Sequence, residues 1–367
     1  MRSSSQQCLL DGFFGRLCAE GAAWRGVSDR AFAKARSRLY RPALTWLNDR
    51  AISMAESAGL IPRWHGFRLV AADASVLMPA SRACARTRGL ADADQRLFAL
   101  YLPGPELMLH ASVHSSSESE RAMLAEALDR LEPDDLLLLD RGYPAAWLVH
   151  MLQQRGIRYV MRCDSTSGWA AVRNFLRAGH TDEQVTLNAP SAQDVADWGC
   201  PTQRPHTRLV RSVASTGAVR VLATNVPASE LPAHLFGELY HQRWRIEEAF
   251  KRLKHRLKLE SVSGLSQQAL IIDVAAKVLA DNLSALLCIA AHPSAPVPSA
   301  RGCNRARVDR IVAGLFPKVL LNIGDTLGAI ADALHMLAHA RQRIRPRRST
   351  PRPAHHLKPH PRLAYKG

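Results

Sequence analysis

Residues 136–139 are four consecutive leucines, and this run constrains the fold more than any other segment. A strand with one solvated face alternates apolar and polar residues, whereas a strand buried on both faces is apolar throughout. We therefore expect a strand at 136–139 that lies inside an α/β sheet, between covered faces. Asp140 follows the last leucine directly, at the carboxyl end of this strand.

The segments around the leucine run alternate between strand and helix patterns. Further strands are expected at 67–78, 96–102, 106–113 and 158–163, with helices starting at Glu120 and passing through Trp147. Pro103-Gly104-Pro105 is a strong turn signal, and Ser117 with Glu120 has the spacing of a capping box. Three strands, a helix, a strand, a helix and a strand predict a mixed α/β sheet in the order of ribonuclease-H-like folds.

Two aspartates stand where such a sheet carries functional groups. Asp140 ends the leucine strand, and polar residues at the carboxyl ends of strands commonly form sites. Asp73 lies in the middle of the first expected strand. The alternatives to Asp73 are Asp92 and Asp94, which fall in a polar loop with no strand to fix them, and Asp140 taken alone could be a loop or capping residue.

Residues 240–259 have no Gly or Pro and are rich in helix formers, so they predict one helix. On a helical wheel, one narrow arc carries Tyr240, Arg243, Glu247 and Lys254, beside an apolar stripe. Carboxylates bind divalent cations, and arginine and lysine bind phosphate oxygens. The simpler alternative is the solvated face of a basic amphipathic helix.

The spacing within this helix resembles a known signature. Tyr, two residues, Arg, three residues, Glu, six residues, Lys is similar to the signature of bacterial insertion-sequence transposases of the IS-four type, which use an Asp-Asp-Glu (DDE) triad. The tetrapeptide Asp140-Arg141-Gly142-Tyr143 resembles the second-carboxylate motif of the same class. Asp73-Ala74-Ser75 departs from the Gly form that often follows the first aspartate.

The resemblance implies both a cofactor and a set of roles. Asp73, Asp140 and Glu247 would be the catalytic residues and would hold two Mg²⁺ ions, for which Mn²⁺ can substitute. Tyr240, Arg243 and Lys254 would bind DNA phosphates. The implied partners are double-stranded DNA, as terminal inverted repeats and as target, and a second copy of the chain in a synaptic complex.

The charge of the chain agrees with a polyanionic partner. Lys and Arg number 49 against 32 acidic residues, for a net charge of +17. Nucleic acid is the usual partner of such a chain, although ribosomal proteins and polybasic membrane binders share this balance. The seven cysteines show no paired spacing, and neither a signal peptide nor a membrane span is expected. These features predict a soluble, cytoplasmic, nucleoid-associated protein.

With the resemblance, the chain divides into six expected parts. They are a helical region at 1–62 with a role in binding DNA ends, the first part of a ribonuclease-H-like catalytic domain at 63–163, a β-rich insertion at 164–217, the second part of that domain at 218–291, a helical region at 292–344, and a basic disordered tail at 345–367. Trp169 and Trp198 are candidates in the insertion for stacking on a displaced base, with a core role as the alternative. His355-His356 could bind metal but lie in the basic tail.

Three functions remain at this stage. The first is a metal-dependent transposase that cleaves element ends and joins them to target DNA. The second is a ribonuclease-H-like nuclease or resolvase. The third is a DNA-binding relic of a transposase without catalytic activity.

Overall fold

A computed structural model describes residues 5–17, 26–40, 42–78, 95–163, 168–213, 217–264, 266–292 and 301–343, with the backbone alone at 301–303, 305 and 341–343. Asp92, Asp94, His355, His356 and the tail at 345–367 lie outside these residues. The chain forms two compact units. One, the sheet unit, comprises residues 61–76 and 96–252, and the other, the helical unit, comprises the remaining three segments.

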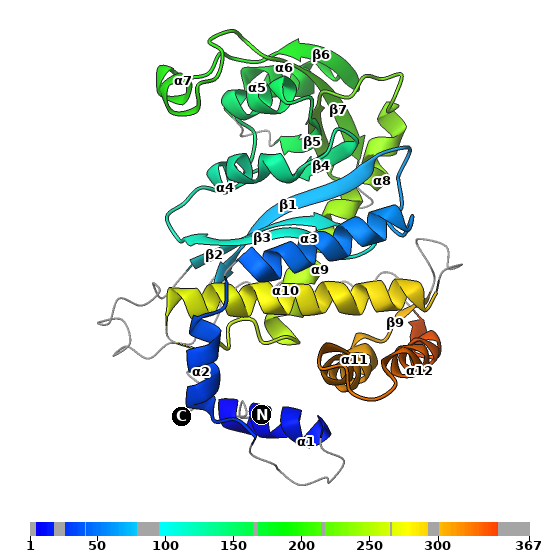
Figure 1. Cartoon of the computed structure of the whole chain (residues 1–367). Helices are drawn as coiled ribbons and strands as arrows, with labels where there is room; N and C mark the ends of the chain where they lie inside the picture. The colour runs from blue at the N-terminus through cyan, green and yellow to red at the C-terminus, as the bar shows by residue number, and fades with distance from the viewer. Residues whose placement is uncertain are drawn as a thin grey trace. The chain divides into compact units, whose positions relative to one another are not determined.

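An eight-stranded mixed sheet, in the order β3-β2-β1-β4-β5-β8-β7-β6, forms the centre of the sheet unit (Figure 1). The strands are β1 (Arg68–Leu77), β2 (Gln95–Leu102), β3 (Leu107–Ser115), β4 (Asp135–Leu139), β5 (Arg158–Cys163), β6 (Asp182–Thr186), β7 (His206–Val213) and β8 (Val219–Thr224). The expected order of three strands, helix, strand, helix and strand is confirmed by α4 (Glu120–Ala127) and α5 (Ala146–Gln154). The α/β fold class is therefore confirmed.

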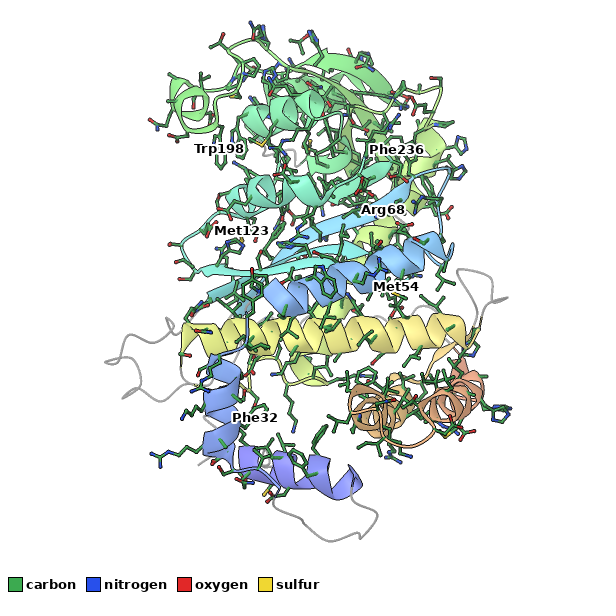
Figure 2. The ribbon with its side chains drawn as sticks, in the orientation of Figure 1. Phe32, Met54, Arg68, Met123, Trp198 and Phe236 are labelled. Atoms are coloured by element: carbon green, nitrogen blue, oxygen red, sulfur yellow. The ribbon has the colours of Figure 1, made fainter. Side chains whose placement is uncertain are left out.

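The leucine run is the buried strand that its composition predicted. All four leucines of β4 have no exposed surface, and β4 pairs in parallel with β1 on one side and β5 on the other. In the β1–β4 register, Ala71 lies opposite Leu138. The start of this pair is fixed by Arg68 and Asp135, both buried, whose guanidinium and carboxylate meet at 2.8 Å (Figure 2).

Beyond β5 the sheet is antiparallel, because β8, β7 and β6 each pair antiparallel with their neighbour. The insertion therefore extends the same sheet. It also contains two helices that were not predicted, α6 (Ala170–Ala178) and α7 (Ala192–Trp198). Both are short and end at a left-handed glycine, and α7 begins with a capping box at Ser191 and Asp194 that was a readable signal.

In the core of the sheet unit, the leucine strand packs against residues 236–240, where the segment with the transposase-like spacing begins. Leu136 and Leu138 join one buried cluster with Phe236, Leu239 and Tyr240 (Figure 2). The last three belong to α8 (Phe236–His241). The apolar side of α8 thus fixes the signature segment against the strand that ends at Asp140.

The helical unit is built around α10 (Gln267–Ala290), which pairs with α3 (Pro42–Ser57). Asn282 donates to Asn48 at 2.7 Å in this pair, and both side chains are buried. The other helices are α1 (Gln6–Leu17), α2 (Asp29–Ser37), α11 (Arg305–Leu320) and α12 (Thr326–Ala338). No helix among the described residues has the length and apolar character that a bilayer crossing requires.

Candidate active site

Asp73 and Asp140 lie side by side at one edge of the central strands. Continuing the β1–β4 register two residues beyond Ala71 and Leu138 sets Asp73 beside Asp140. Asp140 begins the loop after β4, where its Oδ1 accepts a 2.7 Å hydrogen bond from the Gly142 amide. The Asp73 side chain is 16% exposed, so both position and burial bring it into an enclosed group of carboxylates.

The signature segment is not the single helix that was predicted for residues 240–259. It consists of α8, a 3₁₀ turn at Gln242–Trp244, and α9 (Arg245–His255). The helix also ends early, because Lys258 adopts a left-handed conformation and the Leu259 amide bonds back to the Leu253 carbonyl. A 3₁₀ turn within a helical run commonly marks a functional point, and here it carries Arg243.

Arg243 links the first and third predicted carboxylates. Its Nη1 lies 3.5 Å from Asp73 Oδ2, and its Nη2 donates to Glu247 Oε1 at 3.1 Å. The side chain is buried between the rings of Tyr240 and Trp244, at 5.9 and 5.6 Å. Its Nε is buried and has no hydrogen-bond partner. Asp73, Arg243 and Glu247 therefore form one cluster in which a donor is left unused.

Tyr240 and Lys254, the other predicted phosphate ligands, have different surroundings. The Tyr240 hydroxyl is buried and donates to the Leu139 carbonyl at 3.2 Å, which ties α8 to the residue before Asp140. Lys254 lies two turns after Glu247 in α9 and pairs with Glu260 at 3.7 Å. The contacts of Tyr240 are those of a residue that positions the second carboxylate.

Concentrated negative charge shapes the electrostatics of the cluster. Burial raises the pKa of Asp73 to about 7; Arg243 opposes this increase, while Asp140 and Glu120 add to it. Burial, followed by the charges of Glu120, Asp73 and Asp140, raises the pKa of Tyr143 far above its usual value. Tyr143 is fully buried, and its hydroxyl has no hydrogen-bond partner. A cation at this point would relieve the repulsion between the carboxylates.

Glu120 is a member of this group that the sequence did not identify. The capping-box prediction for Ser117 and Glu120 is wrong, because the N-cap of α4 is Ser119, which accepts the Ala122 amide at 3.1 Å. The Ser117 hydroxyl instead bonds to that of Ser115. Glu120 is thus the first residue of α4, and its carboxylate is free of the capping role.

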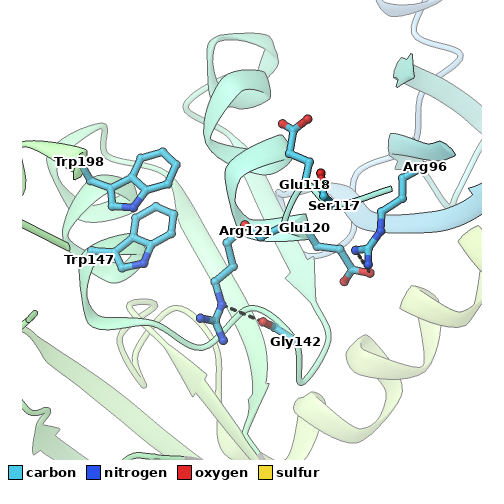
Figure 3. Close-up of a pocket in the computed structure, with 9 residues that line it drawn as sticks. Arg96, Ser117, Glu118, Glu120, Arg121, Gly142, Trp147 and Trp198 are labelled. Carbon is cyan, nitrogen blue, oxygen red and sulfur yellow. Dashed lines mark hydrogen bonds and ion pairs between the residues drawn. The ribbon is translucent and has the colours of Figure 1, made fainter. Parts of the chain in front are cut away.

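A cavity of about 460 Å³ opens beside Gly142 (Figure 3). Arg96, Glu120, Arg121, Trp147 and Trp198 are among its lining residues. Trp147 and Trp198 stack face to face, with ring centroids 4.1 Å apart. Trp198 therefore reaches this cavity from the insertion, whereas Trp169, the other tryptophan singled out there, is buried.

A second group of metal-binding side chains lies on β3, on α4 and on the segment between them. His114, Glu118 and Glu126 have ligand atoms within 4.8 Å of one another. His114 Nδ1 lies 3.0 Å from Glu118, and the Glu126 side chain is 66% exposed. His114 and Glu118 are only partly exposed, so this group is a half-buried histidine–carboxylate pair with an exposed glutamate beside it.

One comparison with known proteins identifies the family of the chain. No match is found among curated proteins. Among solved structures, the chain is similar to a cryo-EM structure of a piggyBac transposase synaptic complex with hairpin DNA, at 9% identity and a TM-score of 0.42, over 92% of this chain and 77% of that one. The model of the transposase DDE domain matches residues 68–283, more than half of the 367 residues. The protein therefore belongs to the DDE transposase family, whose members cleave and join DNA strands with divalent metal ions.

Proposed function

We propose that the protein is the transposase of a bacterial insertion sequence, with Asp73, Asp140 and Glu247 as its catalytic triad. The convergence of the three carboxylates supports this proposal. Asp73 lies beside Asp140 in the sheet register, and Glu247 shares the Arg243 guanidinium with Asp73. These residues come from β1, the loop after β4, and α9, in the order that the family signature requires.

The donor set fits hard divalent cations. Carboxylate oxygens are the preferred protein ligands of Mg²⁺, with Mn²⁺ able to replace it. Burial, with smaller contributions from the charges of Asp140 and Glu120, raises the pKa of Asp73, and a bound cation would stabilise its ionised form. Asp73, Asp140 and Glu247 would together hold two such ions. Such ions activate the attacking oxygen and stabilise the leaving oxygen of a phosphodiester.

Arg243 is the residue best suited to contact the DNA phosphate. Its guanidinium is held beside the carboxylates, and its Nε has no hydrogen-bond partner. When cations neutralise Asp73 and Glu247, the attraction that holds Arg243 weakens, and a phosphate oxygen becomes the competing acceptor. Tyr240 would hold the strand end that carries Asp140, and Lys254 would contact the phosphate backbone farther along α9.

The substrate would be double-stranded DNA, first as the terminal inverted repeats of the element and then as the target. The net charge of +17 supports binding to a long polyanion. Pairing of two ends would require two copies of the chain. Strand transfer by the cleaved 3′ end then uses the same carboxylates as cleavage does.

The test uses a labelled duplex that carries the DNA flanking the gene. Wild type, Asp140→Asn and Glu247→Gln are compared with Mg²⁺, Mn²⁺ and chelator. Asp129→Asn is the control, because this carboxylate is 84% exposed and pairs with Arg155. We expect cleavage at one position, dependent on metal, lost in both triad variants and retained in the control. Binding without cleavage in the wild type would leave a DNA-binding relic, and cleavage at scattered positions would indicate a nuclease.

A further inference from the structure

The carboxylates of Glu120 and Asp140 both lie close to the α-carbon of Gly142. A Cβ atom at residue 142 would lie 3.0 Å from Asp140 Oδ1 and 3.3 Å from Glu120 Oε2. Any side chain there would crowd both carboxylates. Glycine therefore permits an approach of two acidic groups that electrostatics alone would oppose.

The first turn of α4 is fixed to the loop that carries Asp140. Arg121 Nε donates to the Gly142 carbonyl at 2.8 Å, and Figure 3 shows this contact beside Glu120. Ser119 caps the same turn. Glu120 is thus held in place by contacts at the residues on either side of it, and its position beside Asp140 does not depend on a flexible segment.

Charges of both signs surround Glu120. Burial and then Asp140 raise the pKa of Glu120, although Arg96, Arg121 and Arg243 act in the opposite direction. Arg96 Nη1 lies 3.7 Å from Glu120 Oε1. An acidic residue in the first helical turn favours the helix dipole, but that role does not require a second carboxylate nearby.

The Tyr143 hydroxyl gives an independent sign that something polar belongs at this point. It is fully buried without a hydrogen-bond partner, and the charges that act on it are those of Glu120, Asp73 and Asp140, opposed by that of Arg243. Buried hydroxyls in folded proteins are almost always paired. A hydrated cation among these carboxylates would supply the missing partner.

We propose that Glu120 is a fourth carboxylate of the catalytic centre and, with Asp73 and Asp140, holds one of its divalent cations. This proposal rests on the proposed triad. Because Glu120 comes from α4, the cation would join the start of this helix to the middle of β1 and to the loop after β4. The lack of a side chain at Gly142 would then leave room for Glu120. Tyr143 would provide a hydroxyl donor beside it.

The experiment measures Mn²⁺ binding to the full-length protein without DNA, from the free-ion signal in electron paramagnetic resonance. Wild type is compared with Glu120→Gln and with the matched control Glu230→Gln, whose carboxylate is 44% exposed and pairs with Arg158 at 3.3 Å. We expect Glu120→Gln to weaken the tighter Mn²⁺ site by about 10- to 100-fold, the range found for groups that support metal ligands. Glu230→Gln should bind as wild type does.

Cleavage gives a second readout. Glu120→Gln should require a higher Mn²⁺ concentration for half-maximal cleavage, and its rate should recover partly when the ion is in excess. A helix-capping role alone would not shift the Mn²⁺ requirement. If Glu120→Gln fails to fold, Glu120→Asp replaces it, because the shorter carboxylate retains the charge and withdraws the ligand atom.

Two results would overturn the proposal: Mn²⁺ binding by Glu120→Gln equal to that of wild type, or equal weakening by Glu230→Gln. Asp140→Asn separates this outcome from failure of the triad. If Asp140→Asn binds Mn²⁺ and cleaves DNA as wild type does, the proposed function fails, whatever the result at residue 120. If Asp140→Asn loses both while Glu120→Gln loses neither, only the fourth carboxylate is rejected.

Discussion

Two buried arginines of the sheet unit use their donor groups in opposite ways. Arg208 on β7 makes a paired contact with Asp182, with Nε at 2.7 Å from Oδ1, and its Nη1 donates to the carbonyls of Val226 and Leu231. It also lies over the Phe236 ring. Arg243 is as deeply buried, but its contacts with Asp73 and Glu247 are longer and its Nε has no hydrogen-bond partner.

This difference between Arg208 and Arg243 distinguishes a buried arginine with a structural role from one with a functional role. The guanidinium of Arg208 has its hydrogen-bond acceptors within the protein itself, so these contacts offset the cost of burying its charge. Arg243 is buried with one donor that has no hydrogen-bond partner. It lies beside the proposed triad, within the residues that match the family. A buried charge whose partners are incomplete in the free protein is suited to a ligand that completes them.

The largest expected effect comes from removing each arginine in turn. Arg208→Leu should lower the free energy of unfolding by about 3–5 kcal/mol, because Asp182 and two carbonyls lose their donors. Arg243→Leu should cost about 1 kcal/mol or less, since fewer good contacts are lost, but should reduce cleavage by about 10²–10³-fold. Urea unfolding and the duplex cleavage assay measure the two quantities. Equal destabilisation by both substitutions would remove the distinction.

The acid beside Arg243 should make the metal-free protein less stable as pH rises. The pKa of Asp73 is about 7 in the folded protein and 3.8 in the reference state, so folding takes up a proton between these values. The associated stability is complete below the lower value and is lost as pH rises through about 7. Its ceiling is about 4 kcal/mol, from roughly three pKa units at 1.36 kcal/mol each.

Asp73→Asn provides the control for this pH dependence. Urea unfolding is measured at pH 5 and pH 8 with chelator present. Wild type should be less stable at pH 8 than at pH 5, and this difference should be much smaller in Asp73→Asn. No difference between the two proteins across this range would mean that Arg243 fully compensates the charge of Asp73 in the folded protein.

Gly142→Ala should impair the site without unfolding it. The added methyl would meet Asp140 Oδ1 at 3.0 Å and Glu120 Oε2 at 3.3 Å, so both carboxylates must shift by a few tenths of an ångström. We expect cleavage to fall by about 10- to 100-fold, or about 1.4–2.7 kcal/mol in activation free energy. Gly168→Ala is the control, because a Cβ there meets nothing within 4 Å, and it should cleave as wild type does.

The smallest expected effect compares two buried tyrosines. Tyr159 has its hydroxyl 3.0 Å from that of Thr207, so Tyr159→Phe should lower the free energy of unfolding by about 1 kcal/mol. Tyr143→Phe removes a hydroxyl that has no partner and should leave stability unchanged or slightly higher. The cleavage rate should show the opposite pattern: Tyr143→Phe should lower it by about tenfold, and Tyr159→Phe should leave it unchanged. Thermal unfolding and cleavage rates decide the comparison.

Local patterns predicted the sheet because each strand carried its own signal. The four leucines, the Pro103-Gly104-Pro105 turn and the strand at 158–163 each specify an element without reference to distant residues. The short helices α6 and α7 were missed although both carried local signals: Val172, Phe175 and Leu176 have helical spacing in α6, and α7 begins with a capping box. The break at Gln242–Trp244 was missed because its residues all favour helices.

The candidate triad could be named from the sequence because two signatures fix the spacing around Asp140 and Glu247. The charge state of the site could not. The pKa of Asp73 depends on burial and on Asp140 and Glu120, which are 67 and 47 residues away in the chain. The local sequence predicted that Glu120 belongs to a capping box. Its position near Asp140 depends on the contact between the start of α4 and the loop at Gly142, which the sequence does not show.

The pairing of α3 with α10 has a consequence for the time course of synthesis. Asn48 and Asn282 are 234 residues apart, and at about 5–20 residues per second the second is made roughly 10–50 s after the first. The sheet unit is complete at residue 252, so it can fold on the ribosome while α2 and α3 still lack their partner. We expect chains stalled near residue 290, in which residue 252 has left the ribosomal exit tunnel and α10 has not, to be cut by trypsin around Arg36 and Arg38 while the sheet unit resists. Interrupted translation would then leave a sheet without a folded amino-terminal region.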